Sequence, residues 1–93
     1  MTWRVGVRPE AELDLVVAAA WYETQRQGLG REFVDELSRV VSSLAENPLL
    51  YADVFDGVRR VFAQRFPYVV SFKIIDNDVV VISILHMRKR RAS

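Results

Sequence analysis

Apolar residues in the first half of the chain recur first at the spacing of a strand and then at the spacing of a helix. Their alternation over residues 2–8 predicts a half-buried strand. Pro9 ends that strand and suits the first turn of a helix. Two helical stripes follow, and Gly28-Leu29-Gly30 between them predicts a tight turn that joins two helices, the second ending at Asn47-Pro48. The stripes consist of Leu13, Val16, Val17, Ala20 and Trp21, and of Phe33, Leu37, Val40, Val41 and Leu44.

The second half of the chain returns to a period of two. Residues 58–64, 68–75 and 79–86 each predict a strand, and Asp76-Asn77-Asp78 predicts a hairpin turn because Asn and Asp tolerate positive φ. The last strand is almost wholly apolar, which favours a central position with both faces covered. Between the helices and these strands, residues 49–57 are expected to form an ordered loop, with Tyr51 and Phe55 anchored on the core.

These elements come in the order β-α-α-β-β-β. We therefore predict an α+β fold in which a helical hairpin packs on one face of a mainly antiparallel sheet, as a single domain over residues 1–93. The other face of the sheet is left to solvent or to a partner. In the strand over residues 58–64, we expect Arg60 to face inward and Arg59 to lie on the open face.

Composition narrows the class of protein. The chain has no cysteine, which excludes disulfides and cysteine-ligated metals. Its longest apolar runs are far shorter than the roughly 20 residues that span a bilayer. Its beginning, MTWRVGVRPE, lacks the apolar core of a secretory signal. We expect a cytoplasmic protein with no membrane contact.

Charge is distributed unevenly along the chain. Residues 1–57 carry 5 Arg and 10 Asp or Glu, a net of −5, whereas residues 58–93 carry 8 Arg or Lys and 2 Asp, a net of +6. The cations lie on and just after the predicted strands. A basic sheet region supported by acidic helices indicates an anionic partner, either a nucleic acid or an acidic protein segment.

The candidate chemistry lies in the same basic third. The candidate cluster consists of Arg59, Arg60, Arg65, His86, Arg88 and Arg90. Arginine grips phosphate or carboxylate with two parallel hydrogen bonds, and His86 is a possible acid or base near neutral pH. The alternative is that the arginines are solvated or pair with acids such as Asp53 and Asp56, and that His86 is an ordinary polar residue. The single histidine and the lack of cysteine argue against a zinc site, and we expect neither a metal nor a cofactor.

The order and spacing of several short motifs over residues 4–90 resemble the RelE/ParE superfamily of toxins from bacterial type II toxin–antitoxin modules. The matching segments are RPEAELDL after the first strand, WYE at residues 21–23, GLGREF at 28–33, NPLLY at 47–51, VRRVFAQRFPYVVSFKI at 58–74 and ILHMRKR at 84–90. Together they are similar to the ParE-like members, often labelled plasmid stabilisation proteins.

The resemblance implies the same β-α-α-β-β-β fold and a small growth-inhibiting toxin. It also implies a cognate ParD- or RelB-like antitoxin, whose C-terminal segment wraps the toxin in a hetero-oligomer. RelE-like members cut mRNA in the ribosome, whereas ParE-like members poison DNA gyrase. A third possibility is a non-toxic member that only binds its antitoxin.

The resemblance also implies roles for particular residues. RelE-like catalysis depends on basic residues, lysines among them, and often on a tyrosine near the C-terminus. No tyrosine follows Tyr68, so His86 would have to replace it, with Arg65 and Arg88 as the other catalytic residues. This thin set favours the ParE-like interpretation, in which the basic third is a binding surface. The candidates for binding the target or the antitoxin are then Arg59, Arg60, Arg65, Arg88, Lys89, Arg90 and Trp21.

Overall fold

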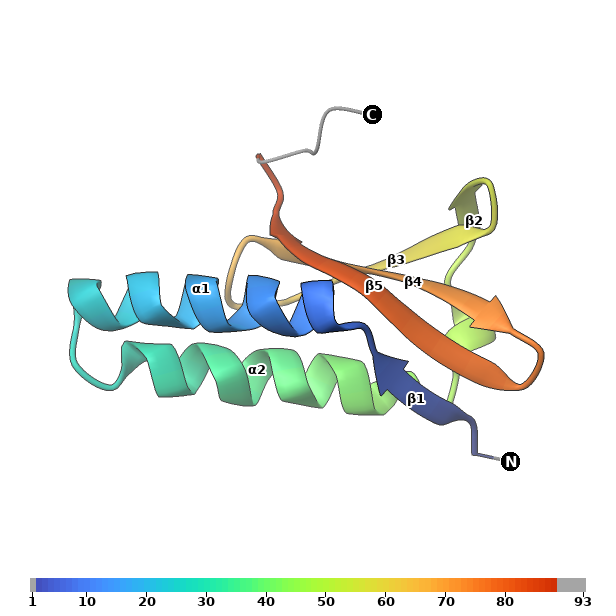
Figure 1. Cartoon of the computed structure of the whole chain (residues 1–93), viewed down its shortest axis with the longest axis horizontal. Helices are drawn as coiled ribbons and strands as arrows, with labels where there is room; N and C mark the ends of the chain where they lie inside the picture. The colour runs from blue at the N-terminus through green and yellow to red at the C-terminus, as the bar shows by residue number, and fades with distance from the viewer. Residues whose placement is uncertain (1, 89–93) are drawn as a thin grey trace.

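Two helices and a five-stranded sheet make up the computed structural model, which describes residues 2–88 (Figure 1). The elements are β1 (Arg4–Val7), α1 (Pro9–Gln25), α2 (Leu29–Ser43), the 3-10 helix η1 (Pro48–Leu50), β2 (Asp53–Phe55), β3 (Val58–Phe62), β4 (Tyr68–Ile75) and β5 (Asp78–His86). No helix among the described residues combines the length and the hydropathy needed to cross a bilayer.

The strands lie in the order β1-β5-β4-β3-β2. Strand β1 pairs with β5 in parallel, and the other three pairs are antiparallel. The α1–α2 hairpin covers one face of this sheet (Figure 1). The predicted architecture, a helical hairpin on one face of a mainly antiparallel sheet, is therefore confirmed.

The core lies between α2 and the sheet. Three side chains are fully buried there, namely Phe33 and Leu37 of α2 and Leu44, which follows directly after the helix. They meet the sheet residues that point toward the helices, and the ring of Phe33 lies 4.8 Å from that of Tyr68 and 5.2 Å from that of Phe66. The fully buried sheet residues are Val70, Phe72, Val79 and Val81. Alternate positions on β4 and β5 thus form the floor on which the hairpin packs.

The turn between the helices is fixed by one carboxylate and by a close contact. Glu23 accepts hydrogen bonds from the backbone N–H groups of Gly28 (2.9 Å) and Gly30 (3.0 Å), which have no partner within α2. Gly28 has φ of 87°, a conformation that favours glycine. A Cβ atom on Gly30 would lie 2.6 Å from the backbone oxygen of Ala19, so only glycine allows the helices to approach this closely.

The structure reverses the predicted faces of β3. Arg59 pairs with Phe72 and Val61 with Val70, and both partners are fully buried. The set that contains Arg59 therefore faces the helices, and Arg60 is exposed on the open face. Because side chains alternate along a strand, assigning one residue to the wrong face reverses the whole strand.

The segment between α2 and β3 is more ordered than a loop. It forms η1 and the edge strand β2, and the pairing of β2 with β3 is irregular between Asp53 and Phe55. Tyr51 packs against Phe72 at 6.1 Å, as predicted for an anchor. The prediction for Phe55 is wrong, because its side chain is exposed.

Candidate functional site

Helix α1 is apolar on two faces, and only one of them packs against the rest of the protein. The inner face consists of Ala11 and Ala18, both buried, with Leu15, Ala19 and Tyr22 packed beside them. The outer stripe is the set of residues that marks the helix in the sequence: Leu13, Val16, Val17, Ala20 and Trp21. Four of its members are exposed over more than half of their surface, at 62% for Leu13 and Val16, 61% for Val17 and 56% for Trp21.

Part of the outer stripe forms one wall of a groove between α1 and the end of β5. This α1–β5 groove has a volume of about 740 Å³. Its lining is mostly apolar, and its few polar groups lie at the base and at one end. Such a combination is typical of binding sites in proteins. The lining residues are Leu13, Asp14, Val17, Ala18, Trp21, Tyr22, Tyr68, Ile84, Leu85, His86 and Arg88.

The opposite wall is an unpaired strand edge. Strand β1 covers β5 only over Asp78–Val81, so within residues 2–88 no strand lies beside the second half of β5 on the edge away from β4. One backbone group on that edge is already bound, because the N–H of Ile84 donates to the Asp14 carboxylate at 3.1 Å. The side chain of Asp14 thus joins α1 to β5.

Three rings form the base of the groove. Tyr68 lies 6.1 Å from Tyr22 and 5.3 Å from His86, measured between ring centroids. Burial raises the pKa of both tyrosines, so their phenols stay protonated at neutral pH. The base therefore presents neutral aromatic surface, with hydroxyl groups able to donate or accept hydrogen bonds.

His86 and Arg88 come together at one end of the groove. The backbone N–H of Arg88 donates to Nδ1 of His86 at 3.0 Å, so Nδ1 acts as an acceptor and the Nε2 atom carries the ring proton. The exposed Arg88 side chain lies two residues after the end of β5. This end of an otherwise apolar groove thus carries a cation suited to an acidic group on a ligand.

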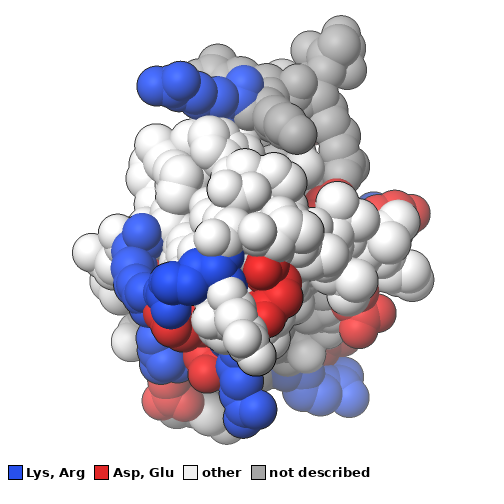
Figure 2. All heavy atoms as spheres, turned by 90° about the vertical axis from the view of Figure 1, so that its left-hand side faces the viewer, with Lys and Arg blue, Asp and Glu red and all other residues white. Residues whose placement is uncertain are grey.

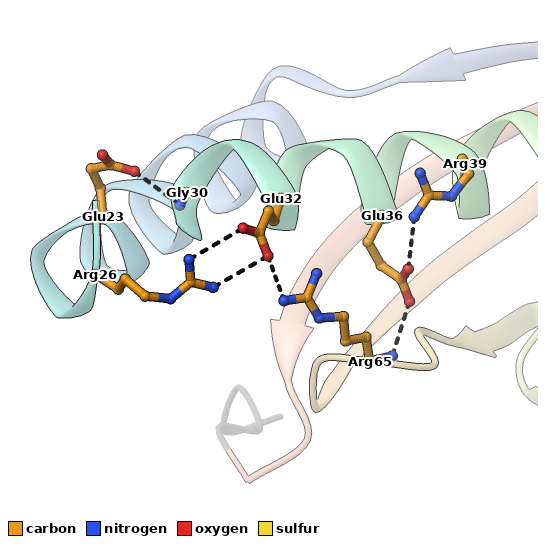
Figure 3. A network of polar contacts seen from close by, with 7 residues as sticks. All are labelled: Glu23, Arg26, Gly30, Glu32, Glu36, Arg39 and Arg65. Atoms are coloured by element: carbon orange, nitrogen blue, oxygen red, sulfur yellow. Dashed lines mark hydrogen bonds and ion pairs between the residues drawn. The ribbon is translucent and has the colours of Figure 1, made fainter. Parts of the chain in front are cut away.

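Arg65, the third residue of the predicted catalytic set, does not line the groove. It lies on the β3–β4 loop, where its side chain forms an ion pair with Glu32 of α2 (Figure 3). The guanidinium group also packs on the ring of Phe66. Arg26 also binds Glu32, at 3.3 Å. Hydrogen bonds from Arg26 and then Arg65 lower the pKa of Glu32, which stays ionised.

The loop that carries Arg65 is held by a second carboxylate of α2. Oε2 of Glu36 accepts the backbone N–H groups of Gln64 (2.9 Å) and Arg65 (3.0 Å), and Oε1 pairs with Arg39 at 3.1 Å (Figure 3). The hydrogen bond from the Arg65 backbone is the largest cause that lowers the pKa of Glu36. The uneven charge distribution is thus partly explained by pairing within the molecule.

The remaining predicted binding residues are scattered. Arg59 donates from Nη1 to the backbone oxygen of Tyr51, on the inner side of the sheet. Arg60 is exposed on the open face. Lys89 and Arg90 lie outside the described residues. Of the sequence candidates within residues 2–88, the groove brings together only Trp21, His86 and Arg88.

Acidic and basic side chains are mixed rather than separated on the face of the molecule that carries the α1–α2 turn. Acidic and basic side chains alternate over the lower part of that face, and a broad uncharged area lies above them (Figure 2). Among the described residues no group of three or more His, Cys, Asp or Glu side chains could hold a metal ion.

The sequence reasoning missed most of the groove. Asp14, Tyr68, Ile84 and Leu85 line it and were not among the candidates. A signal was present, because residues 15–22 are apolar at every position and therefore around the whole helix. A helix that is apolar all round but lies at the surface of a small protein needs a partner for one of its faces.

Comparisons with known proteins identify one family and two solved structures with a similar fold. The family model described as "ParE toxin of type II toxin-antitoxin system, parDE" matches residues 5–91. Among solved structures, the chain is similar to one from the chromosomal ParDE system of P. aeruginosa, with a TM-score of 0.83, 17% identity, and coverage of 91% of this chain and 96% of that one.

A second similar structure comes from the toxin–antitoxin complex RelBE2 of Mycobacterium tuberculosis. Its TM-score is 0.61 at 18% identity, and the match covers 92% of this chain and 99% of that one. Identities this low show a shared fold. A sequence comparison with curated proteins gave no significant match.

Proposed function

Because the chain belongs to the ParE family of toxins from type II toxin–antitoxin systems, we propose that it is a growth inhibitor neutralised by a cognate ParD-like antitoxin that binds the α1–β5 groove. We further propose that it acts in the cytoplasm as a plasmid-stabilising toxin, by binding DNA gyrase. The observation that carries the proposal is the outer stripe of α1, part of which forms one wall of a mostly apolar groove.

The size of the stripe supports a protein partner. About 60% of each of four large apolar side chains is exposed. Full burial of such a side chain stabilises a complex by roughly 1.5–3 kcal/mol, so each of the four retains about 1–2 kcal/mol of unused burial. The described residues offer nothing that covers them. A partner segment with its own apolar side chains would cover these four side chains. An acidic group at the end of that segment would meet Arg88.

The groove also limits the choice of mechanism. Ribonuclease chemistry of the RelE type would require Arg65, His86 and Arg88 to act on one phosphate. His86 and Arg88 line the groove, but Arg65 does not, because its side chain is bound to Glu32 of α2. This separation favours a toxin that acts by binding.

The second candidate function, a ribosome-dependent mRNA endoribonuclease, is favoured by one arrangement. Tyr68 lies against His86 beside Arg88, which places a phenol, an imidazole and a guanidinium at one end of the groove. Tyr68 was not expected in this position. A phenol next to a base is chemically competent for proton transfer.

Two assays separate these functions. Purified protein at micromolar concentration should inhibit supercoiling by DNA gyrase and increase the cleaved gyrase–DNA species. Unchanged supercoiling, together with codon-phased mRNA cuts that disappear in His86→Ala, would replace the gyrase proposal with the nuclease. Expression without any effect on growth would contradict both and leave a non-toxic antitoxin-binding protein.

The antitoxin part of the proposal has its own test. Co-expression with the gene encoded beside this one should restore growth for the wild-type chain but not for Leu13→Asp. Leu49→Asp is a matched control, because Leu49 is exposed to the same extent, 62%, and lies outside the groove. Equal rescue of the two variants would show that the antitoxin binds elsewhere.

A further inference from the structure

A second exposed apolar surface lies on the connection between α2 and β3. Four large side chains within seven residues are exposed there, at 62% for Leu49, 75% for Leu50, 53% for Val54 and 71% for Phe55. We call these four residues the edge patch. Phe55 was expected to anchor this segment on the core, but most of its aromatic side chain is exposed. Exposed apolar groups clustered in this way mark interaction sites in soluble proteins.

The edge patch includes an open edge of the sheet. Strand β2 is the last strand in the order β1-β5-β4-β3-β2, so its outer backbone groups have no partner strand among residues 2–88. The opposite edge is protected by charge, because Arg4 of β1 is highly exposed and pairs with Asp78. The three residues of β2 contain neither lysine, arginine nor proline, the residues that usually prevent edge pairing.

The one acid in β2 does not protect this edge. The Oδ1 atom of Asp53 accepts the backbone N–H of Gly57 at 3.1 Å, so its carboxylate is directed into its own hairpin. Asp56 and Gly57 both have positive φ, which closes the β2–β3 turn tightly. The outer side of β2 is therefore left to Val54 and Phe55.

We propose that the edge patch is an interface between two copies of this chain, with the two β2 strands paired antiparallel about a two-fold axis at Val54. This arrangement places Val54 of one copy opposite Val54 of the other, and Asp53 opposite Phe55. A two-fold interface of this kind uses the same surface of both copies.

The interface is small, and its size predicts its strength. The exposed parts of the four side chains amount to roughly 400–500 Å² of apolar surface per copy. A standard interface buries about 800 Å² per partner. The two short strands add only a few hydrogen bonds. The dimer should therefore dissociate at about 10–100 µM.

The inference does not depend on the proposed function. The α1–β5 groove and β2 lie at different ends of the sheet, with β4 and β3 between them. A dimer through the edge patch leaves the groove open in both copies. Its formation can be measured in the purified full chain without any antitoxin or target.

Sedimentation equilibrium of the full chain from about 1 to 300 µM tests the proposal. The wild type should shift from monomer to dimer over this range. Val54→Lys should remain a monomer, because it places two lysines face to face on the axis. Val16→Lys is the matched control, as Val16 is also an exposed valine, on the outer stripe, and it should dimerise like the wild type. Thermal melts check that both variants fold.

A cysteine cross-link tests the geometry even if Val54→Lys fails to fold. The chain has no cysteine, so each variant carries one thiol. Opposed residues of antiparallel strands have Cβ atoms about 4.5–5.5 Å apart, close enough for a disulfide after small adjustments. Val54→Cys should form a covalent dimer under mild oxidation much faster than Val16→Cys. A wild type that stays monomeric throughout, or cross-linking of Val16→Cys at an equal or greater rate, would overturn the proposal.

Discussion

Glu36 should be the acidic residue whose loss most destabilises the fold. Its side chain is only 8% exposed and links α2 to the β3–β4 loop. Replacing it with alanine removes the acceptor for the backbone N–H groups of Gln64 and Arg65 and also the ion pair with Arg39. These are charge-assisted hydrogen bonds from backbone groups, which no other carboxylate on α2 can accept in the same geometry.

The magnitude follows from those two amides. Leaving a buried N–H group without a partner costs about 1–3 kcal/mol. Because the two amides are only partly buried, water can replace some of the lost bonding, and Glu36→Ala should cost about 2–4 kcal/mol in total. For a domain of this size the melting temperature should fall by roughly 10–25 °C.

Glu36→Gln separates the acceptor from the charge. Its side-chain oxygen can still accept both backbone N–H groups, so the free energy of unfolding should fall by only about 1 kcal/mol, mainly through weaker hydrogen bonds. Asp35→Ala is the control, because Asp35 is the exposed neighbour on the same helix, and its effect should stay within about 0.5 kcal/mol.

The assay is urea unfolding followed by circular dichroism, with the melting temperature as a second readout. Equal slopes for all variants would show that the same transition is measured. If Glu36→Ala destabilises the protein no more than Asp35→Ala, the contacts of Glu36 do not hold the β3–β4 loop and the reasoning fails. An equal loss in Glu36→Ala and Glu36→Gln would show that charge, rather than hydrogen-bond acceptance, is what matters.

Three further predictions concern the helical turn, pH and the mechanism. Gly30→Ala should destabilise the protein by several kcal/mol in urea unfolding, because its Cβ would meet the backbone oxygen of Ala19 at 2.6 Å; an unchanged midpoint would contradict the close helix contact. The folded state lowers the pKa of Glu32 from 4.5, so the unfolded chain binds more protons as the pH falls. The stability that ionised Glu32 contributes is thus complete above pH 4.5 and should decline as the pH falls below that value. Melting curves of Glu32→Gln should show a smaller decline than those of the wild type. If the protein acts by binding gyrase, His86→Ala and Arg88→Ala should keep the ability to inhibit growth to within a few fold, whereas loss of all activity in both would favour the nuclease.

The order of elements was predictable because each has a clear period. The alternation in β4 and β5 and the helical stripe of α2 match the residues that are buried: Phe33, Leu37 and Leu44 are both the predicted stripe of the second helix and the centre of the core. The family resemblance pointed to the same fold, and the match of the family model confirms the resemblance.

Which apolar face of α1 packs against the rest of the protein was not predictable from hydrophobicity alone. Its larger apolar residues, such as Leu13 and Trp21, lie outside, and small ones, Ala11 and Ala18, pack inside. Small residues allow the helix to approach the sheet and α2 closely, as the contact between Gly30 and Ala19 shows. Packing geometry therefore determines which of the two apolar faces of α1 is buried. A periodic pattern of hydrophobic residues does not show which face that is.

The candidate site was the hardest part to predict. Its cations were grouped because they are close in the sequence, yet the structure directs Arg59 inward, Arg60 outward and Arg65 toward α2. The pairing of β3 with β4 and the acids of α2 determine these directions, and both depend on contacts between distant parts of the chain. Apolar residues of α1 and β5, rather than the arginines, form most of the groove.

The most direct test of the account is the affinity of the antitoxin for three forms of this chain, measured by titration calorimetry. The account predicts that Leu13→Asp, which places a charge in the α1–β5 groove, weakens binding by about 10–100-fold relative to the wild type. Leu49→Asp, equally exposed but outside the groove, should bind within about twofold of the wild type. Unchanged affinity in Leu13→Asp, or a larger loss in Leu49→Asp, would contradict the claim that the groove is where the antitoxin docks.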